Sequence, residues 1–267
     1  MVHWRLRAGC LAAVLLCALA QVAKAETLTL ATGEWPPYTS TGLKHGGFAT
    51  RIVREAFESE GLEVKVVYYP WARAVALAGQ PDSGIDGVYP ISHSSERETL
   101  FYFSRPVATG TNAFFHLRSR PFTWQSLADL SGVTIGANVG YSYGDAFQAA
   151  ERKKALRVER VGDPATNFRK LLAGRLDLVL MNVDEAKYTL AMQFPADAWK
   201  VDFHPRVVVA QDDFLAVGRR HPRARELIET FNRGLTRLQE EGKLERYLME
   251  SRRGDYLPVA PPFGAAP

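Results

Sequence analysis

The chain has 267 residues, of which 46% are apolar and 23% are charged, and its formal net charge is +4. These fractions are typical of globular proteins and argue against disordered, collagen-like and coiled-coil chains. The length is sufficient for one large domain or for two lobes of about 100 residues each. Most of the net charge and both cysteines lie in the N-terminal segment.

The first 25 residues have the pattern of a secretory signal peptide. Arg5 and Arg7 precede an uninterrupted apolar run from residue 11 to residue 20, and small residues then lead to a predicted cleavage after Ala25. Ten apolar residues span about 15 Å as a helix, which is half of the ~30 Å bilayer core, so a transmembrane anchor is the weaker interpretation. Neither cysteine is placed as in a lipoprotein signal. We therefore expect export to the periplasm.

The predicted mature chain is almost neutral and has no cysteine. Removal of the segment leaves 30 basic against 29 acidic residues. We therefore expect no disulfide, thiol nucleophile or cysteine-based metal site, and no nucleic-acid partner. The remaining histidines show no metal-ligand spacing, and no phosphate-binding glycine motif occurs, so we expect neither a metal nor another cofactor.

After residue 26, short strand patterns alternate with helical patterns. In the stretch 47–61, apolar residues recur at helical spacing until Gly61 ends the pattern. The order strand, helix, strand, helix, strand predicts a parallel sheet with helical crossovers. The predicted strands are 27–33, 62–70 and 85–91, and the predicted helices are 47–61 and 71–79.

A second series of the same kind begins near residue 130, and strand-like connectors at 111–117 and 206–218 join the two series. Its predicted strands are 133–140, 156–162 and 176–182, and its predicted helices are 143–152, 164–174 and a segment that ends at about 193. An amphipathic helix pattern from 221 to 252 is interrupted at Gly234 and Gly242. A Pro/Gly/Ala-rich tail, predicted to be flexible, covers 253–267.

Two α/β units joined by two connectors predict two lobes. Ligands of such sheets bind beyond the carboxyl ends of the strands. We therefore expect a ligand site at the loops that follow residues 32, 70, 89, 137 and 181.

Four motifs occur in a characteristic order along the chain. They are GVYPISHSSERETLFYFSRPV (87–107), ADLSGVTIGANVGYSYG (128–144), LLAGRLDLVLMN (171–182) and EGKLERYLMES (241–251). Together they resemble the family 3 extracellular solute-binding proteins, the polar-amino-acid-binding components of ABC importers. The segments EWPPYT (34–39) and YPWARA (69–74) are similar to a subgroup of this family.

The resemblance implies an α/β, two-lobed periplasmic-binding-protein fold of type II. Each lobe is expected to be a mixed sheet flanked by helices, and two hinge strands join the lobes. Lobe one would comprise 26–112 plus 210–252, and lobe two would comprise 113–205. The family implies a protein that closes on a small polar ligand and docks on an ABC permease at the inner membrane, with no stable oligomer.

The resemblance places a ligand carboxylate among five residues. Arg97 matches the family arginine that holds the carboxylate by a bidentate pair, although a surface ion pair with a neighbouring glutamate is the ordinary alternative. Ser92 matches a hydroxyl that contacts the same group. Gly140, Tyr141 and Ser142 match a lobe-two turn whose backbone amides and hydroxyl complete the site.

Aromatic side chains follow two of the predicted strands. Trp35 and Trp71 are at positions where the family places rings against the ligand, and Tyr38 and Tyr89 are further candidates. The alternative for each is packing in the core.

The recognition of a ligand amine departs from the family pattern. Asn182 stands where amino-acid binders commonly carry an aspartate, and Asp184 follows two residues later. Either Asp184 or Glu34 replaces the missing charge, or the ligand is not an ordinary α-amino acid. Arg73 is a candidate for a second acidic group of the ligand, although solvated loop charges are the ordinary alternative for Glu34 and Arg73.

Two other functions compete with transport. A few similar exported proteins resemble cyclohexadienyl dehydratase, in which case Glu34 would donate or accept a proton while Arg97 held the substrate. No nucleophile motif supports an enzyme, and we expect none. A sensor whose closed form docks on a receptor kinase would have the same sequence features.

Overall fold

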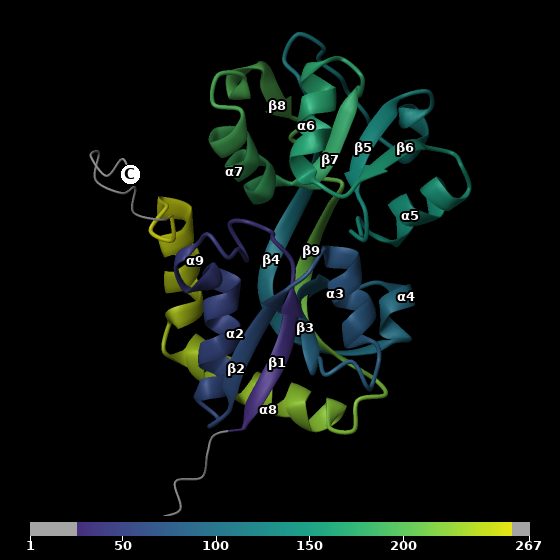
Figure 1. Cartoon of the computed structure of the whole chain (residues 1–267). Coiled ribbons are helices and arrows are strands. Elements are labelled where there is room, and N and C mark those ends of the chain that lie inside the picture. The colour runs from purple at the N-terminus through teal and green to yellow at the C-terminus, as the bar shows by residue number, and fades with distance from the viewer. Residues whose placement is uncertain (1–25, 258–267) are drawn as a thin grey trace, which may run out of the picture.

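The computed structural model describes residues 26–257. The predicted signal peptide and the tail beyond residue 257 lie outside the described residues. Figure 1 shows two lobes, with two long strands running between them. The predicted α/β class is confirmed: helices flank a mixed sheet whose strand order is β2-β1-β3-β9-β4-β7-β5-β6, with β8 paired to β4.

Lobe one contains a parallel sheet built as its sequence pattern predicts. Leu28 and Leu30 point into the core from alternate positions of the first strand, and Leu30 lies opposite Gly87 of the neighbouring strand. The strands are β1 (Thr27–Thr32), β2 (Glu63–Tyr68) and β3 (Gly87–Ser92), and the helices are α2 (Phe48–Glu58), α3 (Trp71–Ala78) and the short α4 (Ser95–Glu98). A 3₁₀ turn precedes α2 at Lys44–Gly46.

The first of the two connecting strands is longer than the sequence pattern suggests, and the second is slightly shorter. The strand β4 (Phe101–Leu117) pairs antiparallel with β9 (Val209–Gly218), from Phe101 opposite Gly218 to Asn112 opposite Val209. The sequence pattern predicts β4 only from residue 111, because Pro106 interrupts the pattern of a strand before that point. The ladder accommodates this proline with register shifts on both sides of it.

Lobe two repeats the arrangement on the far side of these strands. Its strand β7 is antiparallel to β4 and parallel to β5, which in turn is parallel to β6, so the sheet is mixed and continuous. The strands are β5 (Thr134–Asn138), β6 (Arg157–Val161), β7 (Leu178–Asn182) and β8 (Val201–Phe203). The helices are α5 (Asp145–Arg152), α6 (Pro164–Leu172) and α7 (Val183–Gln193), with 3₁₀ turns at Leu127–Leu130 and Ala198–Lys200.

The last part of the chain returns to lobe one as α8 (Ala224–Glu240) and α9 (Lys243–Arg253). The expected interruption at Gly242 is present, since this residue has a φ of +67° and lies between the two helices. The expected interruption at Gly234 is wrong. This glycine lies inside α8 where the helix packs on α2, and a methyl group there would lie 2.0 Å from the carbonyl oxygen of Ala56.

We expect Gly234→Ala to lower the free energy of unfolding by about 1–3 kcal/mol, as overpacking does in a dense interior. The gain in helix propensity, about 1 kcal/mol, is too small to offset a backbone clash. The urea midpoint of the variant measures the loss. Gly162→Ala is the matched control, because nothing lies within 4 Å of a methyl group there. Equal midpoints for the two variants would contradict the close packing of α8 on α2.

The ordered part of lobe one extends beyond its predicted end at residue 252. Tyr256 is buried, its carbonyl oxygen accepts the backbone N–H of Lys44 at 2.9 Å, and its hydroxyl lies 3.2 Å from a guanidinium nitrogen of Arg51. Tyr256 therefore anchors the segment 253–257 to lobe one, at a place where the sequence predicts a flexible tail. The Gly- and Pro-rich composition of the segment concealed these contacts.

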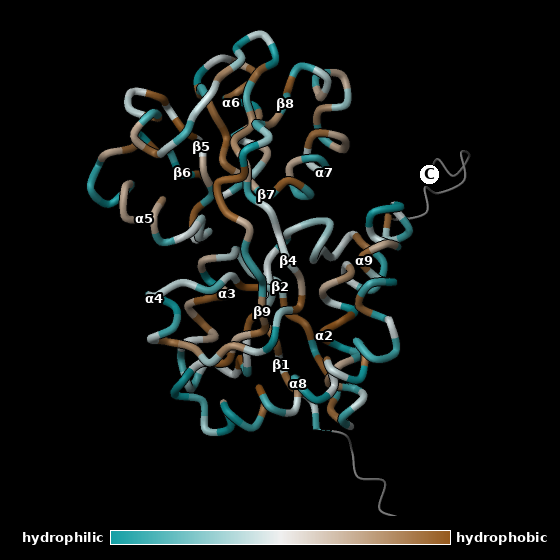
Figure 2. The backbone as a smooth tube through the Cα atoms, turned by 180° about the vertical axis from the view of Figure 1, so that it is seen from behind, coloured by the Kyte–Doolittle hydropathy of each residue, from teal (hydrophilic) through white to brown (hydrophobic). Residues whose placement is uncertain are grey.

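Apolar residues concentrate on the strands and on the inward faces of the helices (Figure 2). The helix α2 illustrates the pattern, since Ile52, Val53, Ala56 and Phe57 are all buried. Within residues 26–257, no helix combines the length and the apolar character needed to cross a membrane.

Candidate functional site

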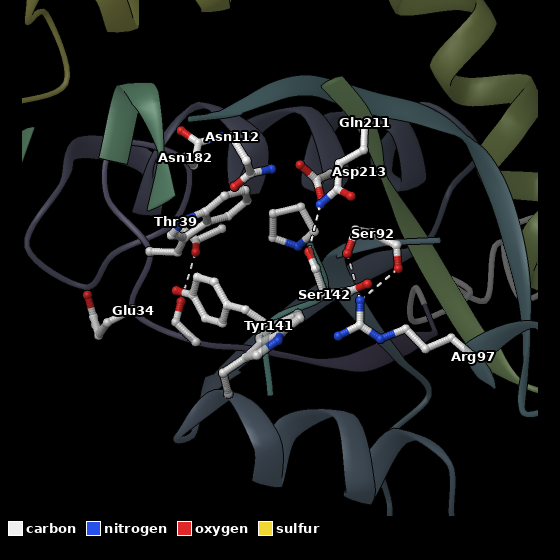
Figure 3. Close-up of a pocket in the computed structure, with 14 residues that line it drawn as sticks. Glu34, Thr39, Ser92, Arg97, Asn112, Tyr141, Ser142, Asn182, Gln211 and Asp213 are labelled. Carbon is white, nitrogen blue, oxygen red and sulfur yellow. Dashed lines mark hydrogen bonds between the residues drawn. The ribbon is translucent and has the colours of Figure 1, made fainter. Parts of the chain in front are cut away.

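A pocket with about 520 Å³ of empty space, its open mouth included, lies between the two lobes (Figure 3). Eight predicted site residues line it: Glu34, Trp35, Trp71, Ser92, Arg97, Tyr141, Ser142 and Asn182. Six further lining residues were not predicted: Gly33, Thr39, Pro90, Asn112, Gln211 and Asp213. The loops after β1, β3, β5 and β7 meet here, as expected for the carboxyl ends of parallel strands.

Arg97 is held in the pocket with part of its guanidinium free. One terminal nitrogen lies 2.7 Å from both the hydroxyl and the carbonyl oxygen of Ser92, and the other donates to the carbonyl oxygen of Gly140 at 2.8 Å. These bonds use three of the five N–H donors of an arginine, and the two that remain are the number that a bidentate carboxylate pair requires. Burial lowers the pKa of Arg97 to about 10, so the side chain stays charged at neutral pH.

Asp213 is the acidic group at the centre of the pocket. It lies on β9 opposite Ser92 of β3 and is only 4% exposed. None of the described residues donates a hydrogen bond to its carboxylate, which lines the cavity. Burial raises its pKa to about 7, although the nearby Arg97 acts in the opposite direction. A buried carboxylate without a partner is costly, and a ligand ammonium would relieve that cost.

Asn182 lines the pocket, but its amide is already used. Its side-chain oxygen caps α7 by accepting the backbone N–H groups of Asp184 and Glu185 at 2.9 and 3.1 Å. Its amide nitrogen donates to the hydroxyl of Tyr38 at 3.3 Å. No acceptor on Asn182 is left for a ligand ammonium, so Asp213 is the better partner for that group.

Tyr38 and Asp184 do not line the pocket and instead join the lobes. The Tyr38 hydroxyl, from the loop after β1, donates to the Asp184 carboxylate at 3.3 Å and accepts from Asn182. Burial, followed by the charge of Asp184, raises the pKa of this hydroxyl, which therefore stays protonated. Two residues predicted to touch the ligand thus form a contact between the lobes.

Three aromatic rings form the walls of the pocket. Trp35 stacks on Tyr38 with ring centroids 4.0 Å apart and meets the edge of Tyr141 from the other lobe at 6.4 Å. Trp71, the first residue of α3, packs against Gly140 of lobe two. Flat apolar faces of this kind suit the aliphatic or cationic part of a small ligand.

Two of the predicted residues lie away from the pocket, and a third lines only its mouth. Tyr89 is fully buried in the core of lobe one, where its hydroxyl bonds to Thr50 at 3.3 Å. Arg73 is exposed on α3, with its guanidinium over the ring of Tyr69. Glu34 lines the mouth of the pocket, but one of its carboxylate oxygens accepts both the backbone N–H and the hydroxyl of Thr41.

The lobe-two turn contributes in a different way from the prediction. Gly140 offers its carbonyl oxygen to Arg97 and does not line the pocket. The Ser142 hydroxyl donates to the side chain of Gln148, and the Ser142 carbonyl oxygen accepts from Gln211 at 3.0 Å. Ser142 therefore lines the pocket with its own hydroxyl engaged, and its backbone N–H has no acceptor among the described residues.

The lobes are in direct contact around the pocket. Besides the bond from Arg97 to Gly140, the hydroxyl of Ser95 in α4 lies 2.5 Å from the carboxylate of Asp145 in α5. With the Tyr38 contact, these bonds join the two lobes at three places. In the described part of the chain, no group of three potential metal ligands occurs.

We expect Tyr38→Phe to weaken ligand binding about two- to tenfold, because two weak interlobe hydrogen bonds are worth about 0.5–1.5 kcal/mol together. The ring and its stacking on Trp35 remain. Calorimetric titration measures the effect. Tyr89→Phe is the matched control, because its hydroxyl bonds within lobe one and should affect stability without changing affinity. Equal affinity for wild type and Tyr38→Phe would show that the contact does not favour closure.

Comparison with known proteins agrees with this architecture. A histidine kinase sensor domain similar to periplasmic binding proteins aligns with a TM-score of 0.72 and 22% identity, over 89% of this chain and 99% of that chain. A mutant of the arginine-binding protein ArgBP from T. maritima aligns with a TM-score of 0.70 and 19% identity, over 85% and 95% of the two chains. The ancestral amino acid-binding protein AncCDT-1, a precursor of cyclohexadienyl dehydratase, gives 0.65 and 19%, over 84% and 96%.

At such low identities these structures establish the two-lobed fold alone. None of the curated proteins compared with the chain matches it. The family model for bacterial extracellular solute-binding proteins, family 3, matches residues 28–250, which is most of the chain. The resemblance seen in the motifs is therefore confirmed, and the chain belongs to family 3 of the bacterial extracellular solute-binding proteins.

Proposed function

We propose that this protein binds a small zwitterionic ligand, with a carboxylate and an ammonium group as in an amino acid, and delivers it to an ABC importer. A single observation carries the proposal. The pocket places a half-buried arginine with two unused N–H donors beside a buried aspartate that has no hydrogen-bond partner among the described residues. Opposite charges on one small ligand would satisfy both groups.

The location supports the same proposal. The chain begins with the pattern of a cleaved signal peptide, and its family is extracellular. We propose a periplasmic protein that is cleaved after Ala25, acts as a monomer and docks on a permease at the inner membrane in its closed form.

A thermal-shift screen of amino acids, opines, polyamines and small organic acids tests the ligand class. A ligand at 100 times its Kd stabilises the folded state by about 2.7 kcal/mol, which raises the Tm by several degrees in a domain of this size. We expect stabilisation only by compounds that carry both charges. The matched controls are the same compounds with the carboxylate amidated or the amine removed. Equal stabilisation by these controls would overturn the proposed recognition.

A sensory function is the second candidate, favoured by the structural similarity to a histidine kinase sensor domain. Deletion of the gene distinguishes the two functions once the ligand is known. Loss of ligand uptake supports transport, whereas normal uptake with loss of a ligand-dependent transcriptional response supports sensing.

We also propose that the protein is not an enzyme. In support of this, Glu34, the acid that would act in a dehydratase-like reaction, is exposed and held by Thr41. Recovery of the identified ligand unchanged after long incubation is the expected result. Conversion into a product would instead favour chemistry of the dehydratase type.

A further inference from the structure

Glu185 is a buried acid directly behind the aromatic walls of the pocket. It lies in the first turn of α7 in lobe two and is 1% exposed. One of its carboxyl oxygens lies 3.2 Å from the hydroxyl of Tyr141. No lysine or arginine among residues 26–257 forms an ion pair with it, so its charge would have no compensation in this position.

A residue from the other lobe covers the second carboxyl oxygen. The indole N–H of Trp35 is close enough to lower the pKa of Glu185. The pair does not reach hydrogen-bond geometry, however, so the Trp35 indole nitrogen and this oxygen are both buried without a partner. Trp35 and Tyr141 are the two rings that meet edge to face across the pocket. Glu185 therefore faces both walls at the point where the lobes touch.

We propose that Glu185 is a positioning residue whose neutral form allows Trp35 to close against Tyr141, so that closure of the pocket takes up a proton. A neutral carboxyl still accepts the hydrogen bond that the Tyr141 hydroxyl donates, and it carries no charge that needs compensation. An ionised carboxyl at the same place would be desolvated without a counter-charge. Separation of the lobes would move Trp35 away and expose the carboxyl of Glu185 to water.

The surroundings of Glu185 support this proton linkage. The titratable groups that face it are Asp213 from β9 and the tyrosines Tyr141 and Tyr143 from the turn after β5. The pKa of Glu185 is raised to about 8, mainly by burial; the contacts with Trp35 and Tyr141 act in the opposite direction, and the negative charge of Asp213 acts in the same direction as burial. The closed form thus holds the proton near neutral pH, and a solvated Glu185 would release it.

This inference concerns the regulation of the proposed ligand site, and its test is independent of any ligand. Residues 26–257 contain no cysteine, so spin labels at Gln80→Cys and Lys153→Cys, two exposed positions in different lobes, report the separation of the lobes. We expect the wild-type protein without ligand to open as the pH rises from 5 to 8 and to change little above that, because the pH dependence lies between the ordinary pKa of a glutamate and the pKa of about 8 in the closed form. We expect Glu185→Gln, which is neutral at every pH, to lose this part of the transition. A pH-dependent opening at lower pH, caused by Asp213, should remain in this variant.

Two further variants keep the test decisive. Tyr141→Phe removes a hydrogen bond that favours the ionised carboxylate, so it should move the transition to higher pH. Glu58→Gln, an exposed glutamate on α2, is the matched control and should behave as wild type. The proposal is overturned if the distance between the labels is independent of pH in wild type, or if Glu185→Gln opens at the same pH. If the lobes open with pH as expected but the thermal-shift screen finds no ligand, this inference is upheld and the proposed function is not.

Discussion

Replacement of Arg97 by alanine is expected to weaken ligand binding by at least a hundredfold. The two free N–H donors of Arg97 offer a charge-assisted, bidentate pair, and removal of one partner of a buried ion pair costs about 3–5 kcal/mol. Each 1.4 kcal/mol corresponds to a factor of ten in Kd. Arg97→Lys should be intermediate, because an ammonium keeps the charge but has no planar fork. Calorimetric titration with the ligand found in the screen measures all three proteins.

The loss should be specific for the ligand carboxylate. An analogue with an amidated carboxylate should bind wild type weakly, and its affinity should fall little further in Arg97→Ala. The affinity of the ligand itself should fall by the full hundredfold or more. Arg73→Ala is the matched control, since this exposed arginine lies outside the pocket. A folded Arg97→Ala protein with the affinity of wild type would show that the arginine only joins Ser92 to Gly140.

The order and type of most elements could be predicted from the sequence, because their patterns are local. The buried residues of α2 recur at helical spacing, and Leu28 and Leu30 of β1 alternate with threonines. The exceptions depend on contacts between segments that are distant in sequence. Gly234 has the appearance of a helix breaker until α2 is seen to pack against it, and Pro106 conceals the first half of β4 until β9 is seen beside it.

The same distinction explains which part of the site was predicted. Arg97 and Ser92 belong to one motif, so the motif brings both of them to the pocket. Asp213 faces Ser92 only because β9 returns from lobe two to pair with β3. A signal was present in the sequence, since a polar stretch of one glutamine and two aspartates, 211–213, interrupts an otherwise apolar strand. An unpaired acid in such a strand indicates a site before any topology is known.

The assignment of the ligand amine changes for a physical reason. Asn182 and Asp184 have chemistry that suits an ammonium group, but capping of α7 uses the first and the Tyr38 contact occupies the second. Sequence alone does not reveal whether a polar side chain is already bonded within the protein. Asp213 replaces them because none of the described residues donates a hydrogen bond to its carboxylate.

Asp213→Asn is expected to weaken binding by about a hundredfold or more at pH 8 and to change its dependence on pH. The variant leaves the ligand ammonium buried without a counter-charge, which costs about 3 kcal/mol or more. Asp212→Asn is the matched control, because this neighbouring carboxylate points to the other side of β9, where its partner is Thr109 at 2.6 Å. It removes the same charge one position away and should bind almost as wild type does.

The pKa of Asp213 determines the sign of the pH effect on binding. Without ligand this pKa is about 7, and an ammonium beside the carboxylate lowers it. Binding therefore releases a proton from Asp213 below pH 7. In Glu185→Gln, which lacks the proton that closure takes up, the affinity should fall about tenfold for each unit by which the pH drops below 7. Calorimetry in buffers of different ionisation enthalpy counts the proton directly. An affinity of Glu185→Gln that is constant from pH 5 to pH 7 would exclude Asp213 as the amine partner.

Stability without ligand should change in the opposite direction to binding. The carboxyl of Asp213 has a higher pKa in the folded protein, about 7, than its ordinary value of 3.8, so the folded state holds the proton more tightly. Its contribution to the free energy of unfolding is complete below about pH 4 and is lost as the pH rises to 7. Asp213→Asn removes this penalty, so its urea midpoint at pH 8 should exceed that of ligand-free wild type. A variant that is more stable and yet unable to bind would show that Asp213 is retained for the ligand, at the expense of the fold.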